Sequence, residues 1–238
     1  MKIELGTWQR LIQLKIMMPE YIDIATPLQD RFPNLAAQIT RFRYVDIQKK
    51  NPDLEEFKKQ VVREIKAEWN PDDLREHPIF RAYRDFFWDL DIDPTKTRPA
   101  AEALIRRVLR NRKIPQINTW VDSYNLASMK TAIPIASFDI DLLHEPLKMR
   151  EARKGEEFLG IGMDEPVTLS GGEAVIEDGN RLVAIYPYRD ADYSKVTIKT
   201  DKVLMLMCGA PGIKKNDLNQ ASQISSEIIT KFCGGEAY

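Results

Sequence analysis

The chain has 238 residues, of which 43% are hydrophobic, so it can bury a sizeable core as one large domain or two small ones. Its 35 basic and 36 acidic side chains give a formal net charge of −1, which argues against a domain that binds nucleic acid through bulk positive charge. No segment approaches the roughly 18 apolar residues of a membrane span, and the N-terminus lacks a signal-peptide pattern, so we expect a cytoplasmic protein. Two cysteines and two histidines, each far apart, predict neither a disulfide framework nor a metal site.

Two amphipathic helices are expected in the first part of the chain. Apolar residues recur at helical spacing from Leu54 to Trp69, and again from Ile79 to Leu90 after the break at Pro78. The first 50 residues show no clear pattern. We therefore predict a mainly helical part over residues 1–90, followed by a core over residues 91–238.

The next predicted helix, which begins near Pro99, is strongly basic. Between Asp93 and Lys113 seven basic residues stand against two acidic ones, a local excess of five positive charges. Such a run is either a solvated helix face or a ridge that contacts phosphates. The candidate phosphate-binding side chains are Arg98, Arg106, Arg107 and Arg110.

A row of polar residues interrupts the following helical segment, which begins near Ile117. Asp122 and Asn125 are three residues apart, so they share one side of a helix. Either they border a pocket, or they fix the adjoining loop by hydrogen bonds to backbone groups. The chain then enters an apolar strand that ends at Asp139, a further candidate for the site.

The second half of the chain is rich in strand patterns. Apolar segments bounded by Gly, Asp or Asn predict strands over residues 133–140, 173–179, 181–188, 195–200 and 202–209. A final helix is expected from about Asn216 to Phe232, with Gly234 as its stop. These elements predict an α+β fold in which helices pack on a largely antiparallel or mixed sheet.

The segment Tyr186–Asp190 holds further candidates. On a strand, Tyr186 and Tyr188 would share one face and Arg189 would point to the other. The rings could stack on a nucleobase and Arg189 could line a substrate pocket, or the tyrosines could be buried and Arg189 paired with a carboxylate. Glu173 is either a turn residue or a residue that orients water.

Four motifs stand in a defined order along the chain: Arg106–Arg107, Val121–Asn125, Ile133–Pro134 to Phe138–Asp139, and Leu169–Glu173. Their order and spacing resemble the B3/B4 domain of the phenylalanyl-tRNA synthetase beta subunit. With the "YPYRD" segment the chain also resembles freestanding B3/B4 proteins. The resemblance spans roughly Asp91 to the end.

This resemblance implies a single B3/B4-type domain over residues 1–238 and an editing function. In the synthetase, the domain hydrolyses the ester that joins a wrong amino acid to the 3′ end of tRNA, so the expected partner is acylated tRNA rather than DNA. The predicted catalytic residues are Asp122, Asn125, Asp139 and Arg189. The predicted substrate-binding residues are Arg98, Arg106, Arg107, Arg110, Glu173, Tyr186 and Tyr188.

One departure leaves a second function open. This chain has Ala136 where the synthetase domain has a histidine. A tRNA- or RNA-binding module without catalysis therefore remains an alternative, and a protein that binds a free amino acid is a third.

The expected chemistry makes few demands. An aminoacyl ester is already activated, so a positioned water and donors facing the developing oxyanion would suffice, each contributing about 10²–10³-fold. No G-x-S-x-G, phosphate-loop or dinucleotide motif is present. We therefore expect hydrolysis without a nucleophilic triad, a metal or a cofactor.

Overall fold

The computed structural model describes residues 19–238. Two predictions concern residues outside this range: the absence of a signal peptide, and the start of the domain predicted over residues 1–238. Within residues 19–238, no helix is long and apolar enough to cross a membrane. The same residues contain no group of three His, Cys, Asp or Glu side chains placed to hold a metal ion.

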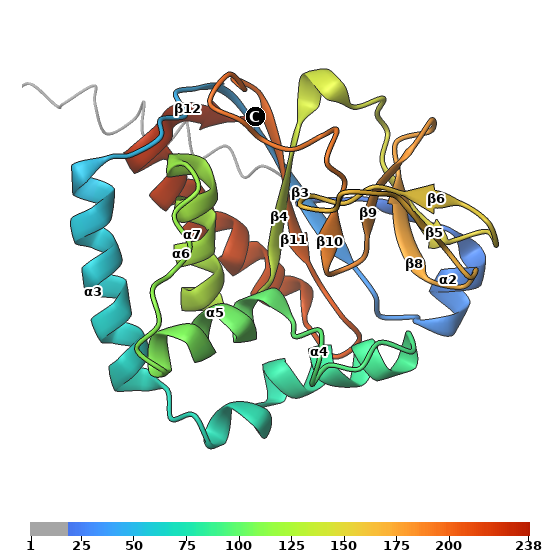
Figure 1. Cartoon of the computed structure of the whole chain (residues 1–238), viewed down its shortest axis with the longest axis horizontal. Coiled ribbons are helices and arrows are strands. Elements are labelled where there is room, and N and C mark those ends of the chain that lie inside the picture. The colour runs from blue at the N-terminus through green and yellow to red at the C-terminus, as the bar shows by residue number, and fades with distance from the viewer. Residues whose placement is uncertain (1–18) are drawn as a thin grey trace, which may run out of the picture.

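The first sheet has five antiparallel strands and forms the middle of the molecule (Figure 1). Its inner strands are β3 (Ala37–Val45) and β11 (Val203–Cys208), and β4 (Ile135–Asp139) pairs with the other side of β11. The short strands β1 (Glu20–Tyr21) and β12 (Gly234–Ala237) pair with two different stretches of β3. All six residues of β11 are buried, as expected for an apolar strand covered on both faces.

The second sheet also has five strands, in the order β10–β9–β8–β5–β2. Only the pair β2–β5 is parallel. The strands are β2 (Asp23–Ile24), β5 (Lys148–Glu151), β8 (Ala174–Glu177), β9 (Leu182–Ile185) and β10 (Arg189–Asp190). A separate pair is formed by β6 (Glu157–Phe158) and β7 (Val167–Thr168).

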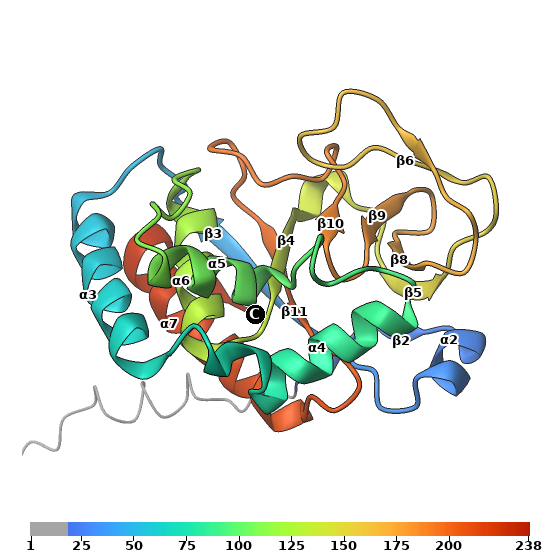
Figure 2. The same ribbon diagram turned by 60° about the horizontal axis from the view of Figure 1, so that its bottom comes forward.

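The longer helices are α3 (Pro52–Glu68), α4 (Pro78–Asp89), α5 (Ala100–Leu109), α6 (Thr119–Thr131) and α7 (Lys215–Cys233). Short helical segments are α2 (Thr26–Arg31), η1 (Asp73–Arg75) and η2 (Ile140–Leu142). In Figure 1, α3, α6 and α7 lie on one side of the first sheet, and the second sheet lies on the other. The turned view in Figure 2 shows β10 between β4 and β9, so β10 lies where the two sheets meet.

Local sequence explains where the site-bearing helices begin. The Asn51 side chain accepts hydrogen bonds from the backbone of Asp53 and Leu54, which caps α3. Asn118 caps α6 in the same way through the backbone N–H of Val121. By contrast, α5 begins after Pro99 with no side-chain cap. Its first N–H groups therefore lack the partner that a capping side chain would supply.

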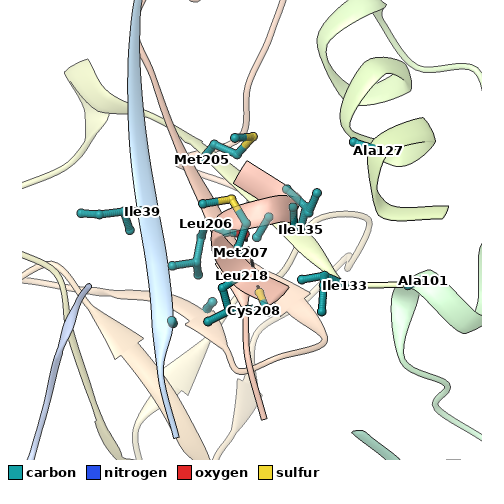
Figure 3. Packing of buried hydrophobic residues seen from close by; sticks show 14 of the residues in the cluster. Ile39, Ala101, Ala127, Ile133, Ile135, Met205, Leu206, Met207, Cys208 and Leu218 are labelled. Atoms are coloured by element: carbon teal, nitrogen blue, oxygen red, sulfur yellow. Dashed lines mark hydrogen bonds between the residues drawn. The ribbon is translucent and has the colours of Figure 1, made fainter. Parts of the chain in front are cut away.

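The core is continuous across the first sheet and its helices. Figure 3 shows Ile39 from β3, Ile135 from β4, Leu206 from β11 and Leu218 from α7 packed together. Burial of this apolar surface is the main force that holds helices and sheet together. The structure confirms the predicted α+β class and the helices expected over residues 54–69, 79–90 and 216–232.

Two strand predictions need correction. Residues 195–200 form an isolated bridge at Lys195 and a turn instead of a strand, because the backbone N–H of Thr197 donates to the Thr200 hydroxyl, an alternative to strand pairing. The strand expected over residues 181–188 ends at Ile185. Tyr186 to Tyr188 form the turn of a β9–β10 hairpin, since Pro187 has no N–H for a sheet ladder. The two tyrosines therefore do not share a strand face.

The N-terminal part contains more sheet than the sequence indicated. Strand β3 is nine residues long and pairs with β11, β1 and β12. It lies within the 50 residues that showed no clear pattern. Residues 19–90 thus supply an inner strand of the first sheet as well as helices.

Candidate functional site

A small pocket lies where the β9–β10 hairpin meets β4, β11 and the start of α5. It encloses about 70 Å³. We call it the hairpin pocket, and most of its wall is apolar. Its lining residues are Ala100, Pro134, Ile135, Ala136, Ala184, Ile185, Tyr186, Pro187, Tyr188, Asp190, Leu206 and Cys208.

The pocket is built by two fixed contacts. Leu206 of β11 stands opposite Ala136 of β4 in the sheet register, which sets one wall. The buried Tyr186 donates its hydroxyl hydrogen bond to the carbonyl of Gly209 at 2.6 Å, which fastens the hairpin turn to the end of β11. Figure 3 shows Ile135 and Leu206 on neighbouring strands in this region. The pocket is therefore preformed by the sheet and the anchored turn.

Asp190 is the carboxylate that lines the pocket. Within residues 19–238 its side chain makes neither a hydrogen bond nor an ion pair with protein. Burial raises the pKa of Asp190 to about 7, although the neighbouring Arg189 charge lowers it. The Arg189 guanidinium itself donates to the carbonyl of Ile161 at 3.2 Å. A carboxylate left without a partner in an apolar pocket is a functional-site candidate.

Tyr124 of α6 lies beside Asp190 and Ser137. Burial raises the pKa of Tyr124 well above its ordinary value, and the Asp190 charge raises it further. Burial likewise raises the pKa of the Cys208 thiol, so Cys208 stays protonated and inert near neutral pH. Apart from Arg189, the titratable groups near Asp190 are therefore neutral hydroxyl and thiol groups.

A second pocket, of about 250 Å³, lies along the basic helix. We call it the basic pocket because no acidic residue lines it. Its lining residues are Lys96, Arg98, Ala103, Arg106, Arg107, Arg110 and Arg112. Arg98 lines this pocket and Ala100 lines the hairpin pocket, so their Cα atoms are at most about 7 Å apart. The two pockets thus adjoin at the start of α5.

Not every arginine of the basic pocket is free to bind a ligand. Arg106 donates through Nε to the buried carboxylate of Glu102 at 2.6 Å, and Arg84 pairs with the same carboxylate at 2.9 Å. Arg107 and Arg110 are exposed and make no ion pair within residues 19–238. The geometry therefore separates a structural arginine, Arg106, from cations that face solvent.

The family model described as "B3/4 domain" matches residues 82–234. The chain belongs to the B3/4 domain family. Two phenylalanine–tRNA ligase beta subunits are among its relatives. The one from Xanthomonas campestris pv. campestris (strain 8004) is 30% identical over 114 residues, 48% of this chain and 14% of that protein. The one from Geobacter sulfurreducens is 32% identical over 108 residues, 45% of this chain and 13% of that protein.

A solved N-terminal fragment of the phenylalanyl-tRNA synthetase beta subunit from Pyrococcus horikoshii also matches. The TM-score is 0.47 at 13% identity, and the match covers 94% of this chain and 55% of that one.

In this B3/4 domain, Asp122 and Asn125 lie on α6 outside the hairpin pocket. Asp122 is buried, accepts from the backbone N–H of Ile117 at 2.9 Å and pairs with Lys58 at 3.1 Å. Asn125 is half-buried and makes no side-chain hydrogen bond within the described part of the chain. Asp122 thus joins α6 to α3 and to the preceding loop.

Asp139 and Arg189 lie at other edges of the B3/4 domain. Asp139 accepts from the Thr200 hydroxyl at 2.6 Å, and it is three residues along β4 from Ala136, about 10 Å away. Arg189 packs against the loop at Ile161. The structure therefore does not bring the four predicted catalytic residues together at the hairpin pocket, and their roles stay a prediction.

Among the predicted substrate-binding residues, Tyr186 and Tyr188 line the hairpin pocket, and Arg98, Arg106, Arg107 and Arg110 line the basic pocket. Glu173 accepts from the backbone N–H groups of Ser170 and Gly171, each at 2.8 Å, as a turn residue does. Sequence reasoning placed Asp190 in the "YPYRD" segment with the two tyrosines but gave it no role in the site. It also overlooked Tyr124, which stands in the polar row of α6.

Proposed function

We propose that this B3/4 domain hydrolyses the ester of a mischarged tRNA in trans. One observation carries the proposal: a small pocket with a carboxylate that has no protein partner within residues 19–238 adjoins a cationic pocket at the start of α5. An aminoacyl-tRNA has the matching chemistry, since its 3′ end carries an ammonium group and its backbone carries phosphates. Family membership and the similarity to a tRNA ligase subunit support a tRNA-related function.

In this proposal the two pockets bind different parts of the tRNA. Phosphates near the 3′ end contact Arg98, Arg107 and Arg110, which face solvent in the basic pocket. The acylated end then enters the hairpin pocket past Ala100. The half-buried ring of Tyr188 offers a surface on which the terminal adenine stacks.

Hydrolysis would depend on positioning. The uncapped N-terminus of α5 reaches the hairpin pocket through Ala100, and its N–H groups are suited to bind the ester carbonyl as negative charge develops on its oxygen. A water held beside the ester then attacks the activated carbonyl carbon. Asp122, Asp139 and Arg189 would act as positioning residues, because their contacts hold α6, β4 and the hairpin in place. The amide of Asn125, which has no hydrogen-bond partner within residues 19–238, would be available to the substrate.

The test is the release of labelled amino acid from a panel of mischarged tRNAs. The wild type should deacylate at least one of them, with and without a chelator. Ala136→Leu fills the hairpin pocket and should reduce the rate more than tenfold. A matched control is Ala237→Leu, which adds the same bulk to a partly buried position of β12 outside the pocket. No release from any tRNA by folded wild-type protein would overturn the proposal.

A binding module without catalysis is the second candidate, and one observation favours it. Ala136 lines the hairpin pocket and stands where the synthetase has a histidine. Its methyl group cannot transfer a proton. Retention of tRNA without release of amino acid would establish this function. Thermal stabilisation by one free amino acid, with no effect of tRNA, would instead indicate an amino-acid-binding protein.

A further inference from the structure

We propose that Asp190 binds the α-ammonium group of the acyl moiety and that the hairpin pocket selects small, uncharged amino acids. This inference rests on the proposed function, because it assumes that an aminoacyl group enters the pocket. It names the group on the substrate that the protein recognises and the class of amino acid that it accepts.

The surroundings of Asp190 show why a cationic ligand is expected. Its titratable neighbours are Tyr124 from α6, Cys208 from β11 and Arg189 from its own strand, and Tyr186 and Tyr188 from the turn line the same pocket. Four of the five are neutral at pH 7, and the fifth, Arg189, donates its hydrogen bond to Ile161. The carboxylate therefore has no cation bound to it within residues 19–238. Asp190 is half-buried, and withdrawing a carboxylate from water is costly unless it is paired or hydrogen-bonded. An ammonium group supplies one charge and three donors.

The size of the pocket limits the acyl group. A volume of about 70 Å³ holds about five to seven water-sized probes, since each requires about 10–15 Å³. An alanyl group has five non-hydrogen atoms and a seryl group six, and a glycyl group, with four, is smaller still. The walls formed by Ala136, Ala184 and Leu206 are apolar and belong to paired strands, so a second charge or an aromatic ring does not fit.

Proton linkage gives this contact a signature that a merely structural residue would lack. Burial raises the pKa of Asp190 to about 7 in the free protein, so below that pH the carboxyl group is largely protonated. An ammonium ligand favours the ionised form, and its binding at pH 6 should therefore release a proton. Affinity should rise as the pH approaches 7 and fall once the amino group of the ligand loses its own proton, near its ordinary pKa of about 7.7–8.0.

The experiment uses ligands that cannot be hydrolysed. We would measure binding of 3′-(alanylamino)-3′-deoxyadenosine by calorimetry, and compare its N-acetyl, lactyl and phenylalanyl analogues. The wild type should bind the alanyl ligand at least tenfold more tightly than each analogue. Asp190→Asn keeps the shape of the side chain, so it should weaken binding of the alanyl ligand about 10–100-fold and leave binding of the lactyl analogue nearly unchanged.

Proton release is measured at pH 6 in two buffers of different ionisation enthalpy. It should occur with the wild type and disappear in Asp190→Asn. The matched control is Asp192→Asn, two residues further on, where the aspartate already pairs with Lys195 at 2.7 Å and does not line the hairpin pocket. This control should bind and release protons like the wild type.

The outcomes separate this inference from the proposed hydrolysis. Equal affinity of wild type and Asp190→Asn for the alanyl ligand, or binding without proton release, would overturn the ammonium contact. Equal affinity for the phenylalanyl analogue would overturn the size limit. Binding that depends on Asp190, with no release of amino acid from any tRNA, would overturn hydrolysis and leave the inference standing.

Discussion

Asp122 is a buried carboxylate and Asp190 is a half-buried one, and their surroundings differ. Asp122 is 3% exposed, and Lys58 and the backbone N–H of Ile117 both donate to it. Asp190 lies at the junction of the two sheets, and no donor within residues 19–238 reaches its side chain. The first arrangement stabilises the fold, whereas the second leaves a charge that a ligand can satisfy. Partners, more than burial, indicate which aspartate serves a site.

The arginines of α5 show the same contrast. Arg106 compensates the buried Glu102, and its loss would leave that carboxylate with Arg84 alone. Arg107 and Arg110 stand on the same helix without a carboxylate within residues 19–238. A basic sequence run thus contains both structural cations and cations available to an anionic ligand.

The largest effect on stability is expected from Asp122→Ala. Removing this carboxylate leaves the Lys58 ammonium with Glu55 alone and the N–H of Ile117 without its acceptor, which should cost about 2–4 kcal/mol in the free energy of unfolding. Urea denaturation at pH 7 measures the loss. The exposed pair Asp141–Lys202 is the control, and Asp141→Ala should cost less than about 1 kcal/mol. Equal losses would show that the buried carboxylate contributes no more to stability than the exposed one.

Asp190→Asn should act in the opposite direction. The pKa of Asp190 is about 7 in the folded protein, above its ordinary value of about 3.9, so the wild type loses stability as the pH rises from about 4 through 7. The variant lacks this penalty and should be about 1–3 kcal/mol more stable at pH 8, with little difference at pH 4.5. Urea denaturation at the two pH values measures both. A variant less stable than the wild type at pH 8 would mean that Asp190 has a protein partner.

Substitutions of the arginines of α5 should affect either the stability of the protein or its binding of tRNA, depending on the residue. Arg106→Ala should cost about 1–2 kcal/mol, because Glu102 keeps only Arg84. The double change Arg107→Ala and Arg110→Ala should leave stability nearly unchanged and lower the salt dependence of tRNA binding by about two units of slope. Arg75→Ala with Lys199→Ala is the control pair, drawn from exposed positions outside the basic pocket. An unchanged slope in the double variant would show that these arginines do not contact phosphates and that they form only a solvated helix face.

The smallest effect is expected from Thr200→Val. The Thr200 hydroxyl donates to Asp139 at 2.6 Å and accepts from the N–H of Thr197, so its removal should cost about 1 kcal/mol. In a chain of this length, that corresponds to a fall in Tm of about 2–4 °C. Scanning calorimetry measures the shift. No change would show that Asp139 does not depend on this contact and would leave it free for a direct role in the site.

The sequence indicated those features that depend on neighbours along the chain. Helical spacing located α3, α4 and α7, and Gly234 marked the end of α7, where the backbone is left-handed at φ 63°. The apolar run of β11 was recognisable as a strand for the same reason. In contrast, β3 was not predicted, although the alternation of charged and apolar residues from Arg41 to Val45 is a strand signal, because the short pattern stands next to the mixed segment Ala37–Thr40.

The sequence by itself determined the α+β class, the basic character of α5 and the motifs that place the chain in the B3/4 family. The tertiary structure alone decided which of these side chains form a site. The sequence does not show which groups contact a given carboxylate, because these groups come from other elements. The partners of Asp122 come from α3 and from the loop before α6. The neighbours of Asp190 come from α6 and β11. The same holds for the meeting of the two pockets at Arg98 and Ala100. It exists because the hairpin turn, anchored by Tyr186, folds against the start of a helix more than 80 residues earlier in the chain.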